Sequence, residues 1–119
     1  MERKNSFDAF LTRRMDELRK AIAALEQEGR DDEANLNKVR LNIVNVFFTV
    51  AAADAKAVGH QGWEAFCQRF QPRFAGLSSP WRARLEKARL HQDACAIAVE
   101  EAKIEMAEQI KKVFLQWRE

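Results

Sequence analysis

Apolar side chains recur every three or four positions along most of this chain, which is the spacing of one face of an α-helix. The pattern predicts three long helices and one short helix, at about residues 6–28, 32–58, 80–118 and 62–71. All four glycines and both prolines lie between Gly29 and Pro80, so the strongest helix breakers stay out of most of the predicted helices. We therefore expect an all-α protein, a small helical bundle in which residues 1–119 form one domain.

The first predicted helix has a single narrow apolar stripe, so it should pack on one side and face solvent on the other. The stripe consists of Phe7, Leu11, Met15, Leu18, Ile22 and Leu25. Asn5 or Ser6 can cap the start of this helix, and Gly29 suits the left-handed position that follows its last turn. The connection to the next helix is short and favours an antiparallel hairpin.

The second predicted helix is apolar around most of its circumference, which is typical of a helix at the centre of a bundle. Its main stripe is Leu36, Val39, Ile43, Val46, Val50, Ala53 and Ala57. A second stripe beside it is Leu41, Val44, Phe48, Ala51 and Ala55, with Phe47 between the two. The longest apolar run, residues 43–53, is shorter than the roughly 20 residues that a membrane span needs, so no membrane partner is expected.

The last predicted helix is longer than the rest of the bundle. Ser79 and Pro80 are typical of a helix start, and a helix over 80–118 would be about 58 Å long, against about 40 Å for the second helix. Either it kinks at the polar patch His91–Asp93, or it extends beyond the bundle and a second subunit covers it. The second interpretation is favoured, and it puts Ile110, Phe114 and Trp117 at a homodimer surface.

The composition is that of a folded, soluble protein, with 47% hydrophobic and 32% charged residues. The first residues contain no apolar segment of a secretory signal. Cys67 and Cys95 lie at apolar stripe positions, where reduced, buried, inert thiols are usual. These features favour a cytoplasmic location.

Basic residues are concentrated in residues 61–90. This segment contains six of them and only two acidic residues, Glu64 and Glu86, for a net charge of +4. They are Arg69, Arg73, Arg82, Arg84, Lys87 and Arg89, with Phe70, Phe74 and Trp81 among them. The segment 69–89 has three interpretations: an ordinary solvated surface, a docking site for an acidic protein partner, or a nucleic-acid contact in which the aromatic rings stack on bases. No helix-turn-helix, zinc-finger or RRM motif accompanies it.

The chain lacks the motifs of common catalytic and metal sites. A di-iron bundle needs Glu-x-x-His pairs, but Ala57 and Ala88 stand three residues before His60 and His91. There is no glycine-rich phosphate loop either. We therefore expect no cofactor and no metal, and an enzyme is not favoured.

Asp54 is the most unusual single residue, because it is a carboxylate on the apolar side of the second helix. A salt bridge to an arginine of the last helix is the expected explanation. The alternative is an acid that faces a ligand together with His60, which would make the protein a small-ligand binder. Asn42, Asn45 and Thr49 are either plain surface or a polar seam that sets the register of a dimer.

These observations favour a small cytoplasmic helical bundle that acts as a protein-interaction or assembly module, with a homodimer expected. The alternative from another class is a nucleic-acid-associated regulator that uses residues 69–89. The sequence does not identify a partner or a pathway.

Overall fold

The computed structural model describes residues 2–119 and is 92% helical, with no strand in this part of the chain. Its elements are α1 (Glu2–Gln27), α2 (Asp31–Val58), the 3-10 turn η1 (Gly59–Gln61), α3 (Trp63–Phe70), α4 (Arg73–Leu90) and α5 (Ala94–Arg118). The predicted all-α bundle is confirmed, and α3 is the predicted short helix.

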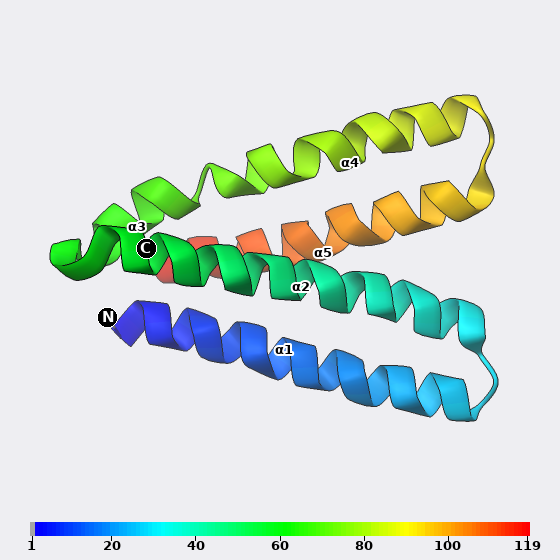
Figure 1. Ribbon diagram of the computed structural model, residues 1–119, viewed down its shortest axis with the longest axis horizontal. Coiled ribbons are helices and arrows are strands. Elements are labelled where there is room, and N and C mark those ends of the chain that lie inside the picture. The colour runs from blue at the N-terminus through cyan, green and yellow to red at the C-terminus, as the bar shows by residue number, and fades with distance from the viewer. Residues whose placement is uncertain (1) are drawn as a thin grey trace.

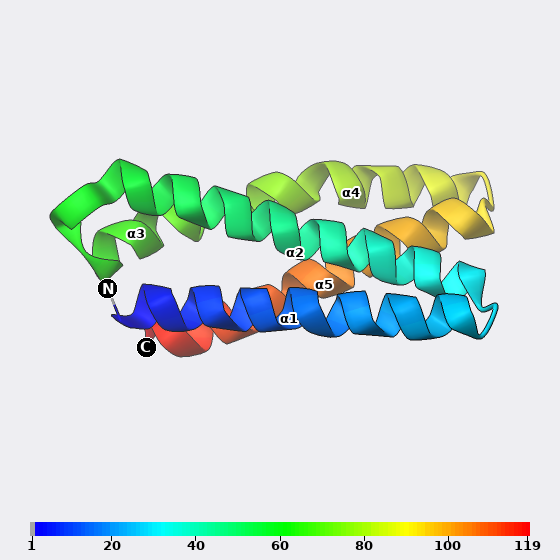
Figure 2. The same ribbon diagram turned by 60° about the horizontal axis from the view of Figure 1, so that its bottom comes forward.

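Two antiparallel hairpins, α1–α2 and α4–α5, lie side by side and are joined at one end by η1 and α3 (Figure 1). α2 packs on α1, α3 and α5, so the prediction of a central second helix is confirmed. Both ends of the described chain lie at the α3 end of the molecule (Figure 2), which we call the closed end. Toward the opposite, open end the two hairpins diverge (Figure 1).

The aromatic residues explain why one end is closed. Residues 11–46 and 82–113 contain no aromatic side chain, so the chain has none to place at the open end. At the closed end, one cluster of rings is packed in stacked and edge-on pairs, formed by Phe7, Phe47, Phe66, Phe70, Phe74 and Phe114. Large rings bury far more apolar area than the alanines and valines that dominate the open end. The apolar area that holds the hairpins together is therefore concentrated at the closed end.

The buried face of α2 is not the main stripe predicted from the sequence. Ile43, Val44, Phe47 and Ala51 are buried, together with Asp54 and Val58 further along the same face. Of the predicted main stripe only Ile43 is buried, whereas Leu36, Val39, Val46 and Val50 are half-buried and Ala53 and Ala57 are exposed. A helix that is apolar on most sides does not reveal which side its neighbours cover. Here the aromatic cluster around Phe47 decides it.

α1 begins earlier than predicted, because it already includes Glu2. Asn5 and Ser6 are therefore inside the helix rather than at its cap. Lys4 is buried: its Nζ atom lies 2.6 Å from the carboxylate of Asp8 and 5.5 Å from the ring centre of Phe66. An ion pair and a cation–π contact compensate for burying this ammonium group.

α4 also begins earlier than predicted, so Pro80 lies inside the helix rather than at its start. A proline there removes one backbone hydrogen bond, which in this position would reach the carbonyl of Gly76. The side chain of Ser78 does not restore this bond. Its hydroxyl donates instead to the carbonyl oxygen of Phe74, one turn earlier, at 2.7 Å. Residues 72–79, which lie between the predicted helices 62–71 and 80–118, are thus mostly helical. Burial of Phe74 and Trp81 on the same helix outweighs the cost of the proline.

The predicted last helix, 80–118, is wrong in its continuity. The chain reverses completely at residues 91–93, so α4 and α5 run antiparallel instead of forming one long helix. The kink considered at His91–Asp93 was expected at the correct position, although the chain reverses there instead of kinking. The favoured interpretation, in which the helix extends beyond the bundle, is wrong. The longest dimension of the molecule is 46 Å, less than the about 58 Å that a straight helix over these residues would need.

The reversal depends on a hydrogen-bond pattern that ends helices. Asp93 N donates to Ala88 O at 3.0 Å, and Gln92 N donates to Arg89 O at 3.2 Å, as in a Schellman motif. The side chain of Asp93 then caps α5 by accepting a hydrogen bond from Ala96 N at 3.1 Å. Gln92 has the left-handed φ of 53° that such motifs usually assign to glycine.

We expect Gln92→Gly to raise the free energy of unfolding by about 0.5–1 kcal/mol, because glycine adopts the left-handed conformation without the steric cost that glutamine has. The gain is reduced by the greater freedom of glycine in the unfolded chain. Urea denaturation followed by circular dichroism measures it. Gln92→Ala is the control and should give no gain, since alanine has the same steric conflict as glutamine.

Candidate interaction site: the cleft between the hairpins

Asp54 is held by two arginines at the closed end. Its side chain is 1% exposed, and it accepts a hydrogen bond from Arg69 Nε at 3.1 Å. Arg73 donates through both Nε, at 3.1 Å, and a terminal nitrogen, at 2.9 Å. This fork matches the two oxygens of the carboxylate, and the hydrogen bond to Asp54 raises the pKa of Arg73 above its ordinary value.

The salt bridge predicted for Asp54 therefore exists, but its arginines lie on α3 and α4 rather than on the last helix. These partners were not predicted, because the helices expected at residues 62–71 and 80–118 leave Arg73 outside any helix, whereas it is the first residue of α4. Both oxygens of Asp54 are occupied and the group is buried, so it offers nothing to a ligand. His60 is exposed in η1 and is not among the partners of Asp54. The predicted small-ligand site at Asp54 and His60 is not formed.

The six basic residues of segment 69–89 do not form one free patch. Arg69 and Arg73 bind Asp54, while Arg82 pairs with Glu108 at 2.9 Å. Arg89 lies 3.7 Å from Glu86. Arg84 and Lys87 are exposed on α4 with no ion pair in the described part of the chain.

The aromatic residues of the same segment are not available for stacking on bases. Phe70 and Phe74 belong to the aromatic cluster, and Trp81 is buried with them. What remains for a nucleic acid is a set of partly neutralised charges on α4. This weakens the argument for a nucleic-acid-associated regulator.

Two of the three residues predicted at the dimer surface are core residues of the single chain. Ile110 and Phe114 are 0% exposed, because the reversal at residues 91–93 folds α5 back against α2 and the closed end. A side chain that its own subunit covers completely cannot also contact a second subunit. Trp117 is 39% exposed and remains accessible.

The two cysteines have different environments. Cys67 is buried in the core cluster, as predicted, and its burial raises the pKa of its thiol. Cys95 is exposed on α5, so the prediction that it is buried was wrong. Cys95 is the second residue of α5, in the first turn after the reversal, and this position accounts for its exposure.

We expect iodoacetamide to modify Cys95 rapidly and Cys67 at least about a thousandfold more slowly in dilute native protein, because Cys67 must wait for the chain to open. Mass spectrometry of quenched samples measures both rates. In denaturant, the two rates should converge. Because burial raises the pKa of Cys67, the folded protein holds the thiol proton more tightly than the unfolded chain does. The free energy of unfolding should therefore fall as the pH rises above the ordinary pKa of cysteine. Comparable modification rates in native protein would contradict the burial of Cys67.

A cleft opens between the two hairpins toward the open end, and we call it the hairpin cleft. It has a volume of about 390 Å³ and is walled by residues of α2 and α5. The residues that line it are Asp32, Asn35, Leu36 and Val39 from α2, and Ala94, Cys95, Ala98 and Val99 from α5. Most of these side chains are apolar, and none is aromatic. The half-buried start of the α2 main stripe is thus an apolar surface that the chain itself leaves partly uncovered.

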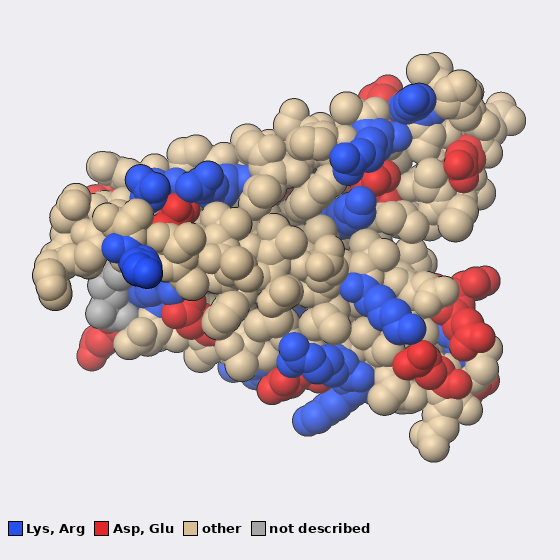
Figure 3. All heavy atoms as spheres, viewed as in Figure 1, with Lys and Arg blue, Asp and Glu red and all other residues tan. Residues whose placement is uncertain are grey.

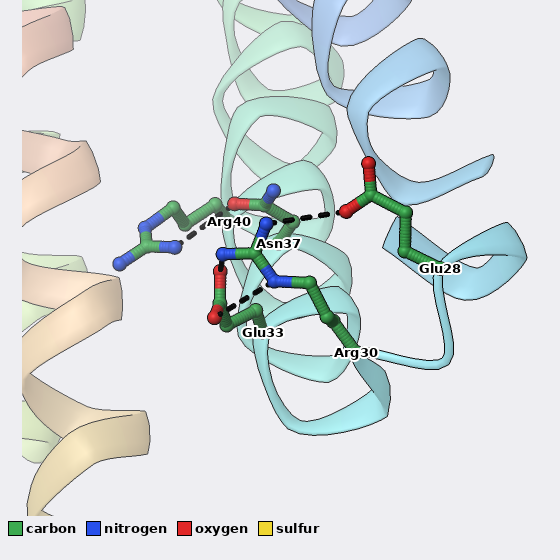
Figure 4. A network of polar contacts seen from close by, with 5 residues as sticks. All are labelled: Glu28, Arg30, Glu33, Asn37 and Arg40. Atoms are coloured by element: carbon green, nitrogen blue, oxygen red, sulfur yellow. Dashed lines mark hydrogen bonds and ion pairs between the residues drawn. The ribbon is translucent and has the colours of Figure 1, made fainter. Parts of the chain in front are cut away.

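The α1–α2 turn beside the hairpin cleft is acidic. Residues 26–33 contain five acidic side chains and only Arg30 as a base, for a net charge of −4. Arg30 donates to Glu33 through two nitrogens and to Glu28 at 3.2 Å (Figure 4). The hydrogen bonds to Glu33 and Glu28 raise the pKa of Arg30, which stays charged. Arg30 therefore neutralises only part of this cluster.

The α4 side of the open end is basic. Residues 82–89 carry four basic side chains and only Glu86 as an acid, for a net charge of +3. Figure 3 shows acidic atoms gathered at the α1–α2 end and basic atoms along α4. At the end of α4, Leu90 is 82% exposed, the largest exposure among the large hydrophobic side chains of residues 2–119. The open end thus combines an apolar cleft, one projecting leucine and two flanks of opposite charge.

Possible metal sites and membrane-spanning helices are further features that bear on a function. No group of three or more His, Cys, Asp or Glu side chains within residues 2–119 is arranged to hold a metal ion. In the same residues, only the helical stretch Asp31–Gln61 is long and apolar enough to span a membrane, with a mean hydropathy of 1.4 over its best 18 residues. Core helices of soluble proteins pass the same test, and this helix packs on three others.

Similarity to other proteins does not assign a function. A comparison of the chain with protein-family models, with curated proteins and with solved structures finds no match in any of the three. A function for this chain is therefore inferred from the geometry and charge of the all-α bundle itself.

Proposed function

We propose that this protein is an assembly module that pairs with a second copy of itself through the hairpin cleft. The observation that carries the proposal is the combination, at one end of one molecule, of an uncovered apolar cleft with an acidic flank and a basic flank. A symmetric pair joins the same patch on both copies, so a patch that contains both charges complements itself. A cytoplasmic location is part of the proposal, and the two free cysteines support it.

The arrangement of the hairpins is compatible with such a pair. A two-fold axis perpendicular to the view in Figure 1, placed beyond the open end, would turn the acidic α1–α2 turn of one copy toward the basic α4 end of the other. The same rotation would bring the end of α4, with the exposed Leu90, beside the α1–α2 turn of the partner, and would set the two clefts opposite each other. The contact between the oppositely charged flanks would then occur twice.

A second copy is preferred to an unrelated acidic partner because the cleft itself has an acidic side. An acidic protein would meet the basic residues of α4 but would be repelled by residues 26–33. The internal pairs of Arg82 and Arg89 further reduce what α4 can offer to such a partner. A copy of the same chain satisfies both flanks at once.

Light scattering coupled to size-exclusion chromatography tests the proposal. The mass should rise with concentration from 13.7 kDa toward twice that value. Val39→Glu should weaken dimerisation by about tenfold or more, because a charge would be buried in the contact. Asn45→Glu is the matched control, as it adds the same charge at an exposed position of the same helix outside the cleft.

Cys95 supplies a second measurement at the same site. If a partner covers the cleft, the rate at which iodoacetamide modifies Cys95 should fall as the protein concentration rises. A constant 13.7 kDa mass at high concentration, with an unchanged Cys95 rate, would overturn the proposal. A dimer that both glutamate variants leave intact would place the contact elsewhere and would overturn it as well.

A further inference from the structure

A second groove lies at the closed end, on the side of α3 away from Asp54, and we call it the α3–α5 groove. Its volume is about 380 Å³. One wall comes from α3 and the start of α4, with Gln68, Gln71 and Phe74, and the other comes from the end of α5, with Lys111 and Arg118. It shares no residue with the hairpin cleft, and it does not depend on the proposed dimer.

The two basic residues of the groove lie on one face of α5. They are seven positions apart, which is close to two full turns of a helix, so their side chains project in nearly the same direction. Lys111 forms no ion pair or hydrogen bond with any part of the chain that the structure describes. No acidic side chain is among the groove residues, so the positive charge in the groove is not neutralised from within it.

Arg118 is only partly satisfied. One terminal nitrogen donates to the carboxylate of Glu64 at 2.8 Å, outside the groove lining. The other terminal nitrogen, Nη1, is buried and has no hydrogen-bond partner within residues 2–119. A buried guanidinium nitrogen without an acceptor is costly, and the Arg118 side chain, which is 28% exposed, would gain an acceptor for it by turning toward an anion in the groove.

The opposite wall offers further donors. Gln68 and Gln71 carry side-chain amides whose N–H groups can donate to an oxyanion. α3 ends at Phe70 and α4 begins at Arg73, so opposite ends of two helix dipoles adjoin the groove and its positive charge comes from the side chains of α5. Pro72, Phe74 and Ala75 add an apolar surface next to these donors.

We propose that the α3–α5 groove binds a small oxyanion, a carboxylate or a phosphate, that is attached to a compact apolar group. The anion would sit between Lys111 and Arg118 and accept hydrogen bonds from the glutamine amides. The apolar group would lie against Phe74 and Pro72. Carboxylate and phosphate share the recognition chemistry of these donors, and experiment distinguishes them.

Titration of ¹⁵N-labelled protein with phenyl phosphate, benzoate and inorganic phosphate tests this site. Amide shifts should concentrate at Gln68, Gln71 and Phe74 and should saturate at millimolar ligand. Phenyl phosphate that binds more tightly than benzoate identifies the phosphate class, and the reverse order identifies the carboxylate class. Phenyl phosphate should also bind more tightly than inorganic phosphate; equal affinity would remove the apolar part of the proposal.

Lys111→Gln should weaken binding by about 5–10-fold, because it removes an unpaired charge from the groove. Lys112→Gln is the matched control: it changes the overall charge equally at the next position, which is not part of the lining, and should leave the affinity unchanged. Equal losses in both variants would indicate only non-specific attraction and would overturn the site. The absence of saturable shifts at the groove amides of the wild-type protein with all three probes would also overturn the site.

Discussion

Replacing Phe114 by alanine is expected to lower the free energy of unfolding by about 4 kcal/mol, the range found for buried phenylalanines. Phe114 is fully buried, with ring centres 5.3 Å from Phe70 and 5.6 Å from both Phe7 and Phe74. Alanine would leave a cavity at the point where α1, α3, α4 and α5 meet. Urea denaturation followed by circular dichroism measures the loss.

Leu115→Ala is the matched control for Phe114→Ala, because it truncates the next residue of α5, which is 36% exposed. It should cost less than about 1 kcal/mol. The comparison also separates the core from the proposed subunit contact, since Phe114→Ala should destabilise the monomer at any concentration. A small, concentration-dependent effect of Phe114→Ala would instead indicate that this ring lies at a contact between subunits.

Asp54→Asn is expected to lower the free energy of unfolding by about 2–3 kcal/mol, because it breaks a buried ion pair. The amide that replaces one oxygen would present its own N–H groups to the arginine donors. The loss should fall at the lower end of the range for buried pairs, because both arginines are about half exposed and can be hydrated again. Thermal and urea denaturation at neutral pH give the value.

Glu108→Gln is the control for Asp54→Asn. It makes the same carboxylate-to-amide change in the pair with Arg82, where both side chains are 55% exposed. An exposed pair contributes between about 0 and 1 kcal/mol. Equal losses for the two variants would contradict the special position of Asp54 in the bundle.

The sequence was sufficient to predict the all-α class, the helices α1, α2 and α3, the first hairpin and the central position of α2. These features depend on local spacing of apolar residues and on Gly29, which has the left-handed φ of 74° expected after a helix. The need of Asp54 for an arginine was also predictable, since a carboxylate on an apolar helix face requires a donor. Its partners were not, because they depend on how α3 and α4 return to α2.

The reversal at residues 91–93 was the main feature that the sequence concealed. The left-handed position is occupied by Gln92, although glycine is the residue that usually marks it. Asp93 followed by an apolar run was an available signal for a new helix start. Pro80 gave the opposite error, since it suggested a helix start where burial of Phe74 and Trp81 carries the helix through.

Both candidate sites depend on that reversal. Leu36 and Val39 were recognised as part of an apolar stripe, but only the antiparallel return of α5 places Val99 and Cys95 opposite them. Lys111 follows Glu108 by three positions, a spacing that favours an ion pair within one helix. In the structure it faces the α3–α5 groove instead. Contacts between distant segments require the topology, which local spacing does not supply.

The confinement of ring side chains to one end has a consequence for motion. Each hairpin can loosen at its turn without disturbing the interlocked rings, so local opening should be least costly near residues 28–33 and 88–96 and most costly around Phe47 and Phe70. Amide hydrogen exchange should therefore slow progressively along α2 from its first turns to its last. Such a gradient would let the mouth of the molecule widen to admit a partner while the opposite end stays intact.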